Sequence, residues 1–521
     1  MGRVWQNARP MKMTASNREE WLAAACAVVS GFLLFAVFSP LEWAWATGVA
    51  LVPVLGMARR VSFRMAMRMG WVSGFLFWLL SIRWLTHVTV LGWVFMSAYC
   101  ALFVLPTIWV ANRWRGGAAG FAGSLAVVWC GGEFLRGWIG GGFPWNLLGV
   151  GLTPWLPAIQ LAEVGGVWLV SGLAVFVNGV VVWAVVERRE WRAWALCGVT
   201  VVAVLGWGAW RVERLETPKR SIRVALVQTA IPQDEKWVTA KIKMIYARLK
   251  ELTLQAQADP RVEVVIWPET ALPDEVRNSE LSYSLVWNLC TNGTQILTGS
   301  LDLATLDSGE PNYFNSAFLF DEEGRMVGEY DKRHLVAFGE FIPMESWIPW
   351  SWRLAMGMPV SISSGKEGAV FRAGKGRIPL SPLICFEDIL PALARADVRD
   401  GARMLVNVTN DAWFDDVMAP RQHMRNAVLR AVENRVPLVR AANTGVTCVI
   451  EPSGRVASVL SDEKGQTAGP GVLWADVAVP SDGMSLTFYT RFGDMYGIAC
   501  AVATILWLAT AMWKRKKQRV F

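Results

Sequence analysis

Long apolar stretches dominate the first 212 residues and return once near the end of the chain. A stretch of about 20 apolar residues can cross a bilayer as a helix, because the hydrocarbon core is about 30 Å thick and a helix rises about 1.5 Å per residue. The pattern predicts eight such helices, the second being the shortest, at approximately residues 20–39, 42–58, 69–87, 90–112, 117–137, 164–187, 192–211 and 494–513.

Basic residues lie in alternate loops of this predicted bundle. They precede the first helix and follow the second, fourth, sixth and eighth, as Arg3, Arg9, Lys12 and Arg18, then Arg59, Arg60, Arg64 and Arg68, then Arg113 and Arg115, then Arg188, Arg189 and Arg192, and finally the run KRKKQR. Loops rich in Lys and Arg stay in the cytoplasm. The pattern therefore predicts cytoplasmic termini and an outer location for the segment between the last two helices. If residues 1–46 were instead a cleaved signal peptide, removing that helix would invert this charge pattern.

The apolar segment between the fifth and sixth helices contains Gly and Pro throughout, including the string GFPW at residues 142–145. A continuous helix cannot run through such residues. We expect an interfacial or re-entrant loop on the outer side of the membrane, near the extramembrane part of the chain.

The hydrophobic pattern changes between about residues 220 and 482, where short β-like runs alternate with amphipathic helices. Strands are predicted at SIRVALVQTAI, VEVVIWPE, QILTGSLDL, NSAFLFD, IPLSPLICFED, ARMLVNVT and LVRAANTG, and helices at residues 236–257, 389–399 and 420–434. This alternation predicts an α/β sandwich with covered sheets. The chain thus divides into a seven-helix bundle (1–215), an α/β domain (220–482) and a final helix with a basic tail (490–521).

Composition supports a membrane protein. Hydrophobic residues make up 53% of the chain and the mean hydropathy is +0.32, which is too apolar for an ordinary soluble enzyme. The 30 Trp residues exceed the 7 Tyr residues, and many end apolar runs, where an amphipathic ring suits the membrane interface. The net charge of +8 comes from short loops beside apolar segments, so it does not indicate a nucleic-acid partner.

Cysteine and histidine spacing argues against a metal centre. Three of the eight cysteines lie outside apolar segments, at spacings that suit neither zinc nor a disulfide framework: Cys290, Cys385 and Cys448. The three histidines, His87, His334 and His423, form no metal-binding pattern. We expect free thiols and no cofactor.

Three residues at strand ends could carry chemistry. Glu269 follows a strand in VVIWPETALP, Lys332 follows the β-like MVGEY, and Cys385 ends the strand of SPLICFED. A carboxylate can take the proton of a thiol, and an ammonium can stabilise the anionic tetrahedral state of acyl transfer. Nearby negative charge, here Glu387 and Asp388, raises the pKa of a thiol, so placement before a helix does not activate Cys385 by itself.

Each of these residues also has a purely structural explanation. A cysteine after an apolar run is commonly a small buried hydrophobe. Glu269 could cap a helix and Lys332 could lie in a solvated loop. Spacing along the chain does not show that the three side chains meet.

Longer strings resemble one family closely. WPETALP, YDKRHLVAFGEFIP, CFED, NVTNDAWF, RQHMRNAVLRAVENRVPLVRAANTG and GFPW, within this helix arrangement, are similar to the apolipoprotein N-acyltransferases over nearly the whole chain. The extramembrane part resembles the nitrilase superfamily, whose fold is an αββα sandwich. The fold class implied is a membrane bundle of about eight helices carrying a nitrilase-like domain.

The resemblance implies a role for each candidate residue. Glu269 is the expected general base, Lys332 the stabiliser of the tetrahedral intermediate and Cys385 the nucleophile. Glu340 and Glu387 are expected to support the site, with Glu387 bonded to Lys332, whereas Asp388 is expected only to begin a helix. Residues expected to contact the substrate are Trp237, Trp413, Arg136 and Trp145 in the GFPW loop; for the tryptophans, core packing or interface anchoring is an equal alternative.

The implied reaction has two lipid substrates. Cys385 would attack the sn-1 ester of a phospholipid, typically phosphatidylethanolamine, and form a thioester. The acyl chain would then pass to the α-amine of the diacylglyceryl-cysteine that begins an apolipoprotein. The family also implies a monomer in the bacterial inner membrane, with the catalytic domain on the periplasmic side and no cofactor.

Two positions depart from the family pattern. Phe386 stands where the family often has Tyr, which removes a hydroxyl group. Asp415 and Asp416 stand where a Gly-Asp-Ser-like turn is usual, which puts the register of that loop in doubt.

Two other functions fit parts of the sequence. A membrane-tethered amidase could use the same three residues on a small soluble substrate, although seven helices are more than a tether needs. A non-catalytic membrane scaffold would not need all three residue types.

Overall fold

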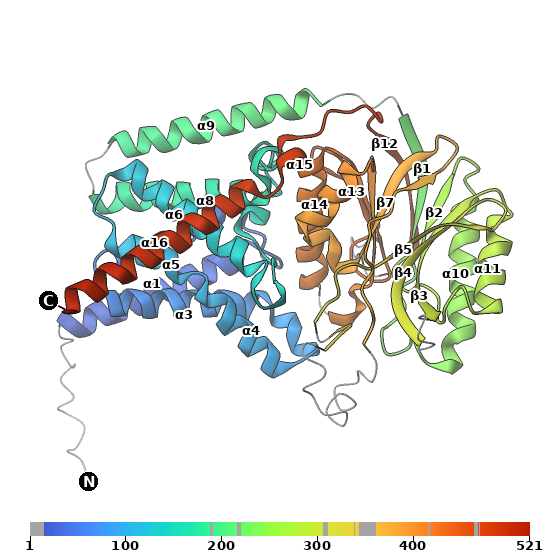
Figure 1. Ribbon diagram of the computed structural model, residues 1–521, viewed down its shortest axis with the longest axis horizontal. Helices are drawn as coiled ribbons and strands as arrows, with labels where there is room; N and C mark the ends of the chain where they lie inside the picture. Colours follow the sequence, from blue (N-terminus) through green and yellow to red (C-terminus); the bar gives the residue numbers. More distant parts are fainter. Residues whose placement is uncertain are drawn as a thin grey trace, which may run out of the picture.

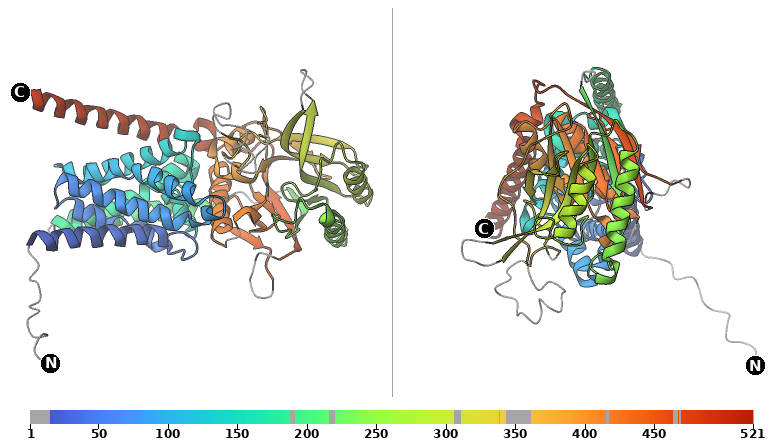
Figure 2. Two further views of the ribbon diagram at one scale, coloured as in Figure 1. Left: turned by 90° about the horizontal axis from the view of Figure 1, so that it is seen from below. Right: turned by 90° about the vertical axis from the view of Figure 1, so that its right-hand side faces the viewer.

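The computed structural model shows two parts side by side along the long axis of the molecule, a helical bundle and an α/β domain (Figures 1 and 2). It describes residues 15–187, 191–215, 220–305, 311–337, 339–342, 361–414, 417–462, 467 and 469–520. The predicted fold class, a membrane bundle with a nitrilase-like sandwich, is confirmed.

Long apolar helices build the bundle. They are α1 (Ala15–Ala36), α3 (Phe63–Ser81), α4 (Val90–Leu102), α5 (Leu105–Arg113), α6 (Ala118–Arg136), α8 (Ala162–Glu187), α9 (Trp191–Glu213) and α16 (Met495–Val520). Within the described ranges, six stretches are long and apolar enough to cross a membrane: Asn17–Ala36, Val90–Arg113, Ala118–Arg136, Ala162–Val186, Trp191–Glu213 and Met495–Trp513.

The predicted number of eight crossings is not confirmed. The second predicted crossing, at 42–58, is a short 3-10 turn, η1 (Ala44–Gly48), followed by α2 (Val52–Ala58), and is too short to span a bilayer. The third corresponds to α3, which begins at Phe63, several residues before the predicted start. The fourth is divided into α4 and α5, with Pro106 in the first turn of α5, but the two together form the candidate span Val90–Arg113, as predicted.

The segment between α6 and α8 has no continuous helix, as its Gly and Pro content predicts. It forms short turns, η3 (Ile139–Gly141), η4 (Leu148–Leu152) and α7 (Leu156–Ile159). Trp145 of GFPW is 2% exposed, so this loop is packed inside the protein.

Two six-stranded sheets form the α/β domain. The first has the order β12-β1-β2-β3-β4-β5 and contains β1 (Arg220–Gln228), β2 (Val264–Ile266), β3 (Gln295–Thr305), β4 (Pro311–Phe320), β5 (Met326–Asp331) and β12 (Gly471–Val479). The second has the order β11-β10-β9-β8-β7-β6 and contains β6 (Phe371–Ala373), β7 (Ile378–Ile384), β8 (Met404–Thr409), β9 (Leu438–Ala442), β10 (Cys448–Ile450) and β11 (Val456–Val459). Strands β1, β2 and β3 run parallel, as do β7, β8 and β9.

The sheets face each other across one apolar core, which includes Val224, Ile266, Leu380, Val406 and Val439. Helices α10 (Ile242–Gln257) and α11 (Glu280–Cys290) pack on the outer face of the first sheet. Helices α13 (Pro391–Arg399) and α14 (Met418–Asn434) pack on the outer face of the second. The layers are therefore α, β, β and α, as predicted. The hydrophobic pattern did not predict α11 or the strands β6, β10, β11 and β12, of which β6 and β10 have three residues each.

Helix α14 joins the domain to the bundle. One apolar cluster continues from the bundle into α13 and α14. Within it, the side chain of Gln422 on α14 accepts hydrogen bonds from the indoles of Trp84 (3.3 Å) and Trp145 (2.7 Å), both from the bundle. The second sheet therefore sits on the end of the bundle, with the carboxyl end of β7 close to the GFPW loop.

Candidate active site

Glu269 follows β2 on a constrained turn. Thr270, the next residue, has a φ of 43°, a conformation that few non-glycine residues adopt. Gly299 of β3 lies against this turn, and a Cβ at that position would be 2.7 Å from the Glu269 Cα atom. The Glu269 side chain is 6% exposed, and its Oε2 atom has no hydrogen-bond partner among the described residues. This oxygen is free to accept a proton or a substrate group.

Lys332 follows β5 and lies between two carboxylates. Its Nζ donates to Glu340 Oε1 at 2.7 Å and lies 3.5 Å from Glu269 Oε1. Burial by itself lowers the pKa of Lys332, but the carboxylates of Glu340 and Glu269 more than offset this and raise the pKa above its ordinary value. Lys332 therefore carries a positive charge at neutral pH.

Asn315 on β4 completes this group and was missed from sequence. Its Nδ2 donates to Glu269 Oε1 (2.8 Å) and to Glu340 Oε1 (3.0 Å). Glu340 also accepts at Oε2 from the Val336 amide (2.9 Å). Burial raises the pKa of Glu340, yet Lys332 and these hydrogen bonds hold it below its ordinary value. Glu340 therefore stays ionised and, together with Asn315, fixes the positions of Lys332 and Glu269.

Cys385 occupies a sharp turn at the carboxyl end of β7, where the 3-10 helix η7 (Cys385–Ile389) begins. Its φ is 51°, another strained backbone conformation. The Asn407 side chain, from β8, donates to the Cys385 carbonyl at 3.0 Å and supports this turn. Taken as a whole residue, backbone included, Cys385 is partly exposed.

The thiol of Cys385 lies in the electrostatic field of the other two residues. Burial and then the Glu269 carboxylate raise its pKa well above the ordinary value, whereas the Lys332 ammonium lowers it. The thiol is therefore protonated at rest and needs a base to become a nucleophile. The structure thus brings the three predicted residues into one buried group, although they come from opposite sheets.

Glu387 does not bond Lys332, so that expectation is wrong. Its Oε1 accepts from the amides of Arg333 (2.7 Å) and His334 (3.0 Å), and its Oε2 accepts from the Ile384 amide (2.8 Å) and the Tyr330 hydroxyl (2.7 Å). Glu340 already lies against Lys332, and these four donors occupy the lone pairs of Glu387. Glu387 therefore ties the loop after Lys332 to the strand before Cys385.

Aromatic rings cover the approach from the bundle. Phe386 stacks between Trp145, with ring centroids 6.1 Å apart, and His334, at 6.0 Å. Trp145 therefore contacts the residue next to the nucleophile, as a lining residue of the site would. Phe386 has no hydroxyl group, so its ring adds only apolar surface to this stack.

The other residues predicted to contact the substrate lie either at the protein surface or buried within the bundle. Trp237 and Trp413 are 47% and 53% exposed. Arg136 is buried and donates to the carbonyls of Phe143 (2.5 Å) and Trp145 (2.9 Å), so it holds the GFPW loop. Asp415 and Asp416 lie outside the described residues.

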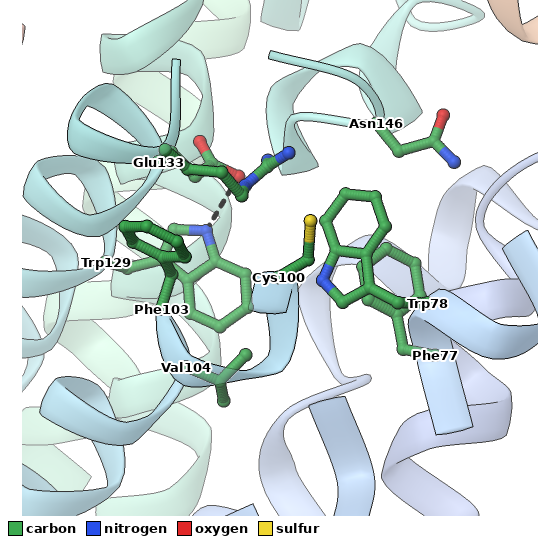
Figure 3. Close-up of a pocket in the computed structure, with 9 residues that line it drawn as sticks. Phe77, Trp78, Cys100, Phe103, Val104, Trp129, Glu133 and Asn146 are labelled. Carbon is green, nitrogen blue, oxygen red and sulfur yellow. Dashed lines mark hydrogen bonds between the residues drawn. The ribbon is translucent and has the colours of Figure 1, made fainter. Parts of the chain in front are cut away.

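Arg136 also lines a small cavity in the bundle, where Figure 3 shows Glu133 bonded to the Trp129 indole and Asn146 across from it. The side chain of Asn146 has no hydrogen-bond partner among the described residues. The cavity measures about 20 Å³, which is room for roughly one water molecule and not for a lipid headgroup.

Lys236 is a further residue of the site that sequence reasoning missed. It is 3% exposed, and its Nζ donates to the Glu269 carbonyl (3.2 Å) and to Thr270 Oγ1 (2.6 Å). Burial lowers the pKa of Lys236 to about 8, although Glu269 and Cys385 act in the opposite direction. The only signal in this stretch was its neighbour Trp237, which the family resemblance implied as a substrate contact.

A second buried group lies beneath Cys385. His423 on α14 contacts Asp411 Oδ1 through Nδ1 (2.9 Å) and Asp388 Oδ1 through Nε2 (2.8 Å). Arg440 on β9 pairs with Asp388 and lies 3.6 Å from Asp411. His423 Nε2 is also 3.3 Å from the Cys385 carbonyl. Asp388 therefore does more than begin a helix: it anchors a charged group that supports the nucleophile turn.

Because of the charged group around His423, we expect the folded protein to lose stability at alkaline pH. Burial lowers the pKa of His423, but Asp388 and Asp411 together raise it to about 9, against the effect of Arg440. Because the folded-state pKa exceeds the unfolded value of about 6.5, the stabilisation is complete below about pH 6.5 and is lost as the pH rises through 9. The midpoint of thermal unfolding should fall across this window. His423→Gln should flatten the fall; an equally steep fall in that variant would contradict the assignment.

Within the described part of the chain, no group of three or more His, Cys, Asp or Glu side chains could hold a metal ion. The expectation of cofactor-free chemistry stays a prediction. The group of Glu269, Lys332 and Cys385 can by itself deprotonate a thiol, hold an oxyanion beside an ammonium, and form a covalent acyl intermediate.

Comparison with known proteins identifies the family. Residues 30–180 match the family described as "Apolipoprotein N-acyltransferase N-terminal domain", and residues 223–480 match "Carbon-nitrogen hydrolase". Apolipoprotein N-acyltransferase of Geobacter metallireducens is 35% identical, with 98% of this chain and 99% of that protein covered. The protein of the same name from Brucella melitensis is 33% identical, with 83% of each covered.

Among solved structures, a mutant amidase of the nitrilase superfamily from Nesterenkonia is 19% identical, with a TM-score of 0.37, and covers 50% of this chain and 93% of that one. The match over nearly full length decides the question, together with a membrane bundle that carries a Glu, Lys and Cys group. The chain belongs to the apolipoprotein N-acyltransferase family and is a bacterial inner membrane protein.

Proposed function

We propose that this protein transfers an acyl chain from the sn-1 position of a phospholipid, through a thioester on Cys385, to the α-amine of the diacylglyceryl-cysteine of apolipoproteins. The observation that carries the proposal is the buried group of Glu269, Lys332 and Cys385 at the end of a membrane bundle. A lipid substrate explains this position, since each CH₂ group taken out of the bilayer costs about 0.8 kcal/mol.

The first half-reaction forms the thioester. Glu269 takes the thiol proton as Cys385 Sγ attacks the ester carbonyl carbon, and the resulting oxyanion lies beside the Lys332 ammonium. Collapse of this intermediate breaks the ester C–O bond. Glu269 returns its proton to the departing lysophospholipid oxygen, which leaves an acyl group on Cys385.

The second half-reaction forms the amide. The neutral α-amine attacks the thioester carbonyl, Lys332 again stabilises the oxyanion, and the C–S bond breaks. The proton lost by the amine passes through Glu269 to the Cys385 thiolate. Water must be excluded between the two steps, because it would hydrolyse the thioester. The apolar stack of Phe386 and Trp145 beside the nucleophile suits this need.

The orientation follows from the distribution of basic residues. We place both termini in the cytoplasm and the α/β domain on the periplasmic side, where apolipoproteins carry their lipid. The half-exposed tryptophans Trp237 and Trp413 would contact the lipids as they enter, and Arg136 would act through the GFPW loop that it holds. A monomer suffices, because one chain supplies all the groups named.

One experiment tests the proposal. The full chain in liposomes is incubated with phosphatidylethanolamine of defined chain length and analysed by mass spectrometry, before and after addition of a diacylated lipopeptide. We expect a mass increase of one acyl chain on Cys385 and its transfer to the lipopeptide amine. Turnover of soluble amides without lipid acylation would instead support the membrane-tethered amidase, and no turnover of either kind would support a scaffold.

Lys236 gives a prediction for the same assay. Lys236→Met removes two buried hydrogen bonds at Glu269 and Thr270, and we expect kcat/KM to fall about ten- to a hundredfold. The pH–rate profile should also lose an inflection near pH 8, where Lys236 titrates in the folded protein. Lys250→Met, on the exposed face of α10, is the matched control and should leave both unchanged. A rate loss without any change of the pH profile would leave Lys236 a purely structural residue.

A further inference from the structure

A cleft of about 580 Å³ lies where α9 meets the α/β domain. Its walls come from the carboxyl end of α9, the turn after α14, the β10–β11 hairpin and the end of β12. The charged residues that line it are Arg211, Arg214, Arg435, Arg455, Glu451 and Asp476. None of them belongs to the candidate active site, so the cleft is a separate feature.

The acidic residues of the cleft are already neutralised. Asp476 pairs with Arg223 at 2.8 Å, and Glu451 lies 3.6 Å from Arg455. Arg214 lies over the ring of Trp210, 5.7 Å from its centroid, and within the described residues no carboxylate pairs with it. The cleft therefore keeps an excess of positive charge.

Arg435 is a buried donor without a full set of acceptors. It is 6% exposed; its Nε donates to Glu163 Oε2 (2.7 Å) and its Nη1 to the Pro452 carbonyl (3.0 Å). Its Nη2 has no hydrogen-bond partner among the described residues. Arg211 shares the same Glu163 through two hydrogen bonds, so one carboxylate serves two guanidinium groups. An anion in the cleft would balance this excess of positive charge.

The cleft lies at the depth of lipid headgroups. Helix α9 has 23 residues from Trp191 to Glu213, a length of about 35 Å that matches the hydrocarbon core of a bilayer. Its carboxyl end, which forms one wall of the cleft, therefore reaches the membrane surface. The half-exposed Trp210 under Arg214 is an amphipathic pair typical of that interface.

The surroundings also suit acyl chains. Only 11% of the apolar window of α9 is buried inside the protein, and in Figure 1 this helix runs along the outside of the bundle. Val212, Leu215 and Met484 add apolar surface to the cleft itself. A molecule with an anionic head and apolar chains fits both parts of the site.

We propose that this cleft binds the phosphate group of a phospholipid, with the acyl chains lying along α9. Arg214 and Arg455 contact the phosphate, and the buried positive charge of Arg435 attracts it. The bound lipid bridges α9 and the α/β domain beside the ion pairs of Glu163. This site is distinct from the acyl-donor site and does not depend on the acyl-transfer reaction.

The test measures lipid binding by native mass spectrometry. All proteins carry Cys385→Ala, so that no lipid is consumed, and the delipidated full chain is titrated with phosphatidylglycerol or with a diacylglycerol of the same chains. We expect one phosphatidylglycerol to bind about thirtyfold more weakly to the Arg214→Gln/Arg455→Gln double variant, since each Arg near an anionic group contributes about 1 kcal/mol and tenfold in affinity is about 1.4 kcal/mol. Arg372→Gln/Arg399→Gln, exposed and outside the cleft, removes the same charge and should bind like the parent protein.

Two further binding measurements identify the ligand. Diacylglycerol, which lacks phosphate, should bind the parent and the double variant equally, and excess inorganic phosphate should not displace phosphatidylglycerol. Displacement by inorganic phosphate would show a site for a free anion and overturn the lipid assignment. Equal affinity of the double variant and the parent for phosphatidylglycerol, with equal melting temperatures, would overturn the site altogether.

Discussion

Replacing Cys385 with serine will abolish acylation of the protein by phospholipid and lower lipopeptide acylation by roughly 10⁴- to 10⁶-fold, the scale expected when a nucleophile is lost. The serine hydroxyl is far less acidic than a thiol, so far less of it is available as the nucleophilic anion. Mass spectrometry of the protein after incubation with phosphatidylethanolamine measures the first effect, and lipopeptide acylation in liposomes measures the second.

The other two cysteines of the α/β domain supply the control. Cys290 on α11 and Cys448 on β10 are both buried, and burial raises the pKa of each thiol to about 12. Cys290→Ser and Cys448→Ser should keep the acyl adduct. An adduct that persists in Cys385→Ser and disappears in either of these variants would show that the nucleophile is misassigned.

Replacing Glu269 with glutamine should lower the rate of thioester formation by about 10²- to 10⁴-fold without unfolding the domain. Glutamine has the same shape and can still accept from Asn315, but it cannot take the thiol proton. The charge of Lys332 stays compensated, because Glu340 lies nearer to its Nζ than Glu269 does, at 2.7 against 3.5 Å. Single-turnover acylation of Cys385 measures the rate, and the melting temperature reports on folding.

Glu340 is the alternative candidate for the general base, and the same assay distinguishes it from Glu269. It is the other carboxylate within reach of Lys332, so full activity in Glu269→Gln together with loss in Glu340→Gln would make Glu340 the base. Glu280→Gln, an exposed glutamate at the start of α11, controls for the loss of one negative charge and should behave like the parent protein.

Local patterns in the sequence were enough to predict the two-part fold and the residues at the strand ends. Apolar runs of about 20 residues become helices in any protein of this composition, because the backbone must satisfy its own hydrogen bonds in lipid. Their number was harder to predict: the segment at 42–58 is apolar but folds as a turn and a seven-residue helix. Strands of three residues, such as β6 and β10, carry too short a pattern to be recognised.

The contacts between residues of the site could not be predicted from the sequence. Lys332 bonds Glu340 and not Glu387, and the choice depends on how the loop after β5 folds back against Asn315 on β4. Asp388 and His423 meet because η7 and α14 pack together on the same sheet. Such contacts join residues far apart in the chain, and no spacing rule predicts them.

The sequence by itself determined that the first 215 residues and the end of the chain form apolar helices and which residue types stand at the ends of the strands, because hydrophobic period and turn chemistry act over a few neighbouring residues. Only the tertiary structure decided that Glu269, Lys332 and Cys385 share one group, that Lys236 and His423 stand behind it, and that arginines from α9 and from the α/β domain line a separate cleft. Burial and charge pairing depend on side chains brought together from both sheets and the bundle, so they exist only once the whole chain has folded.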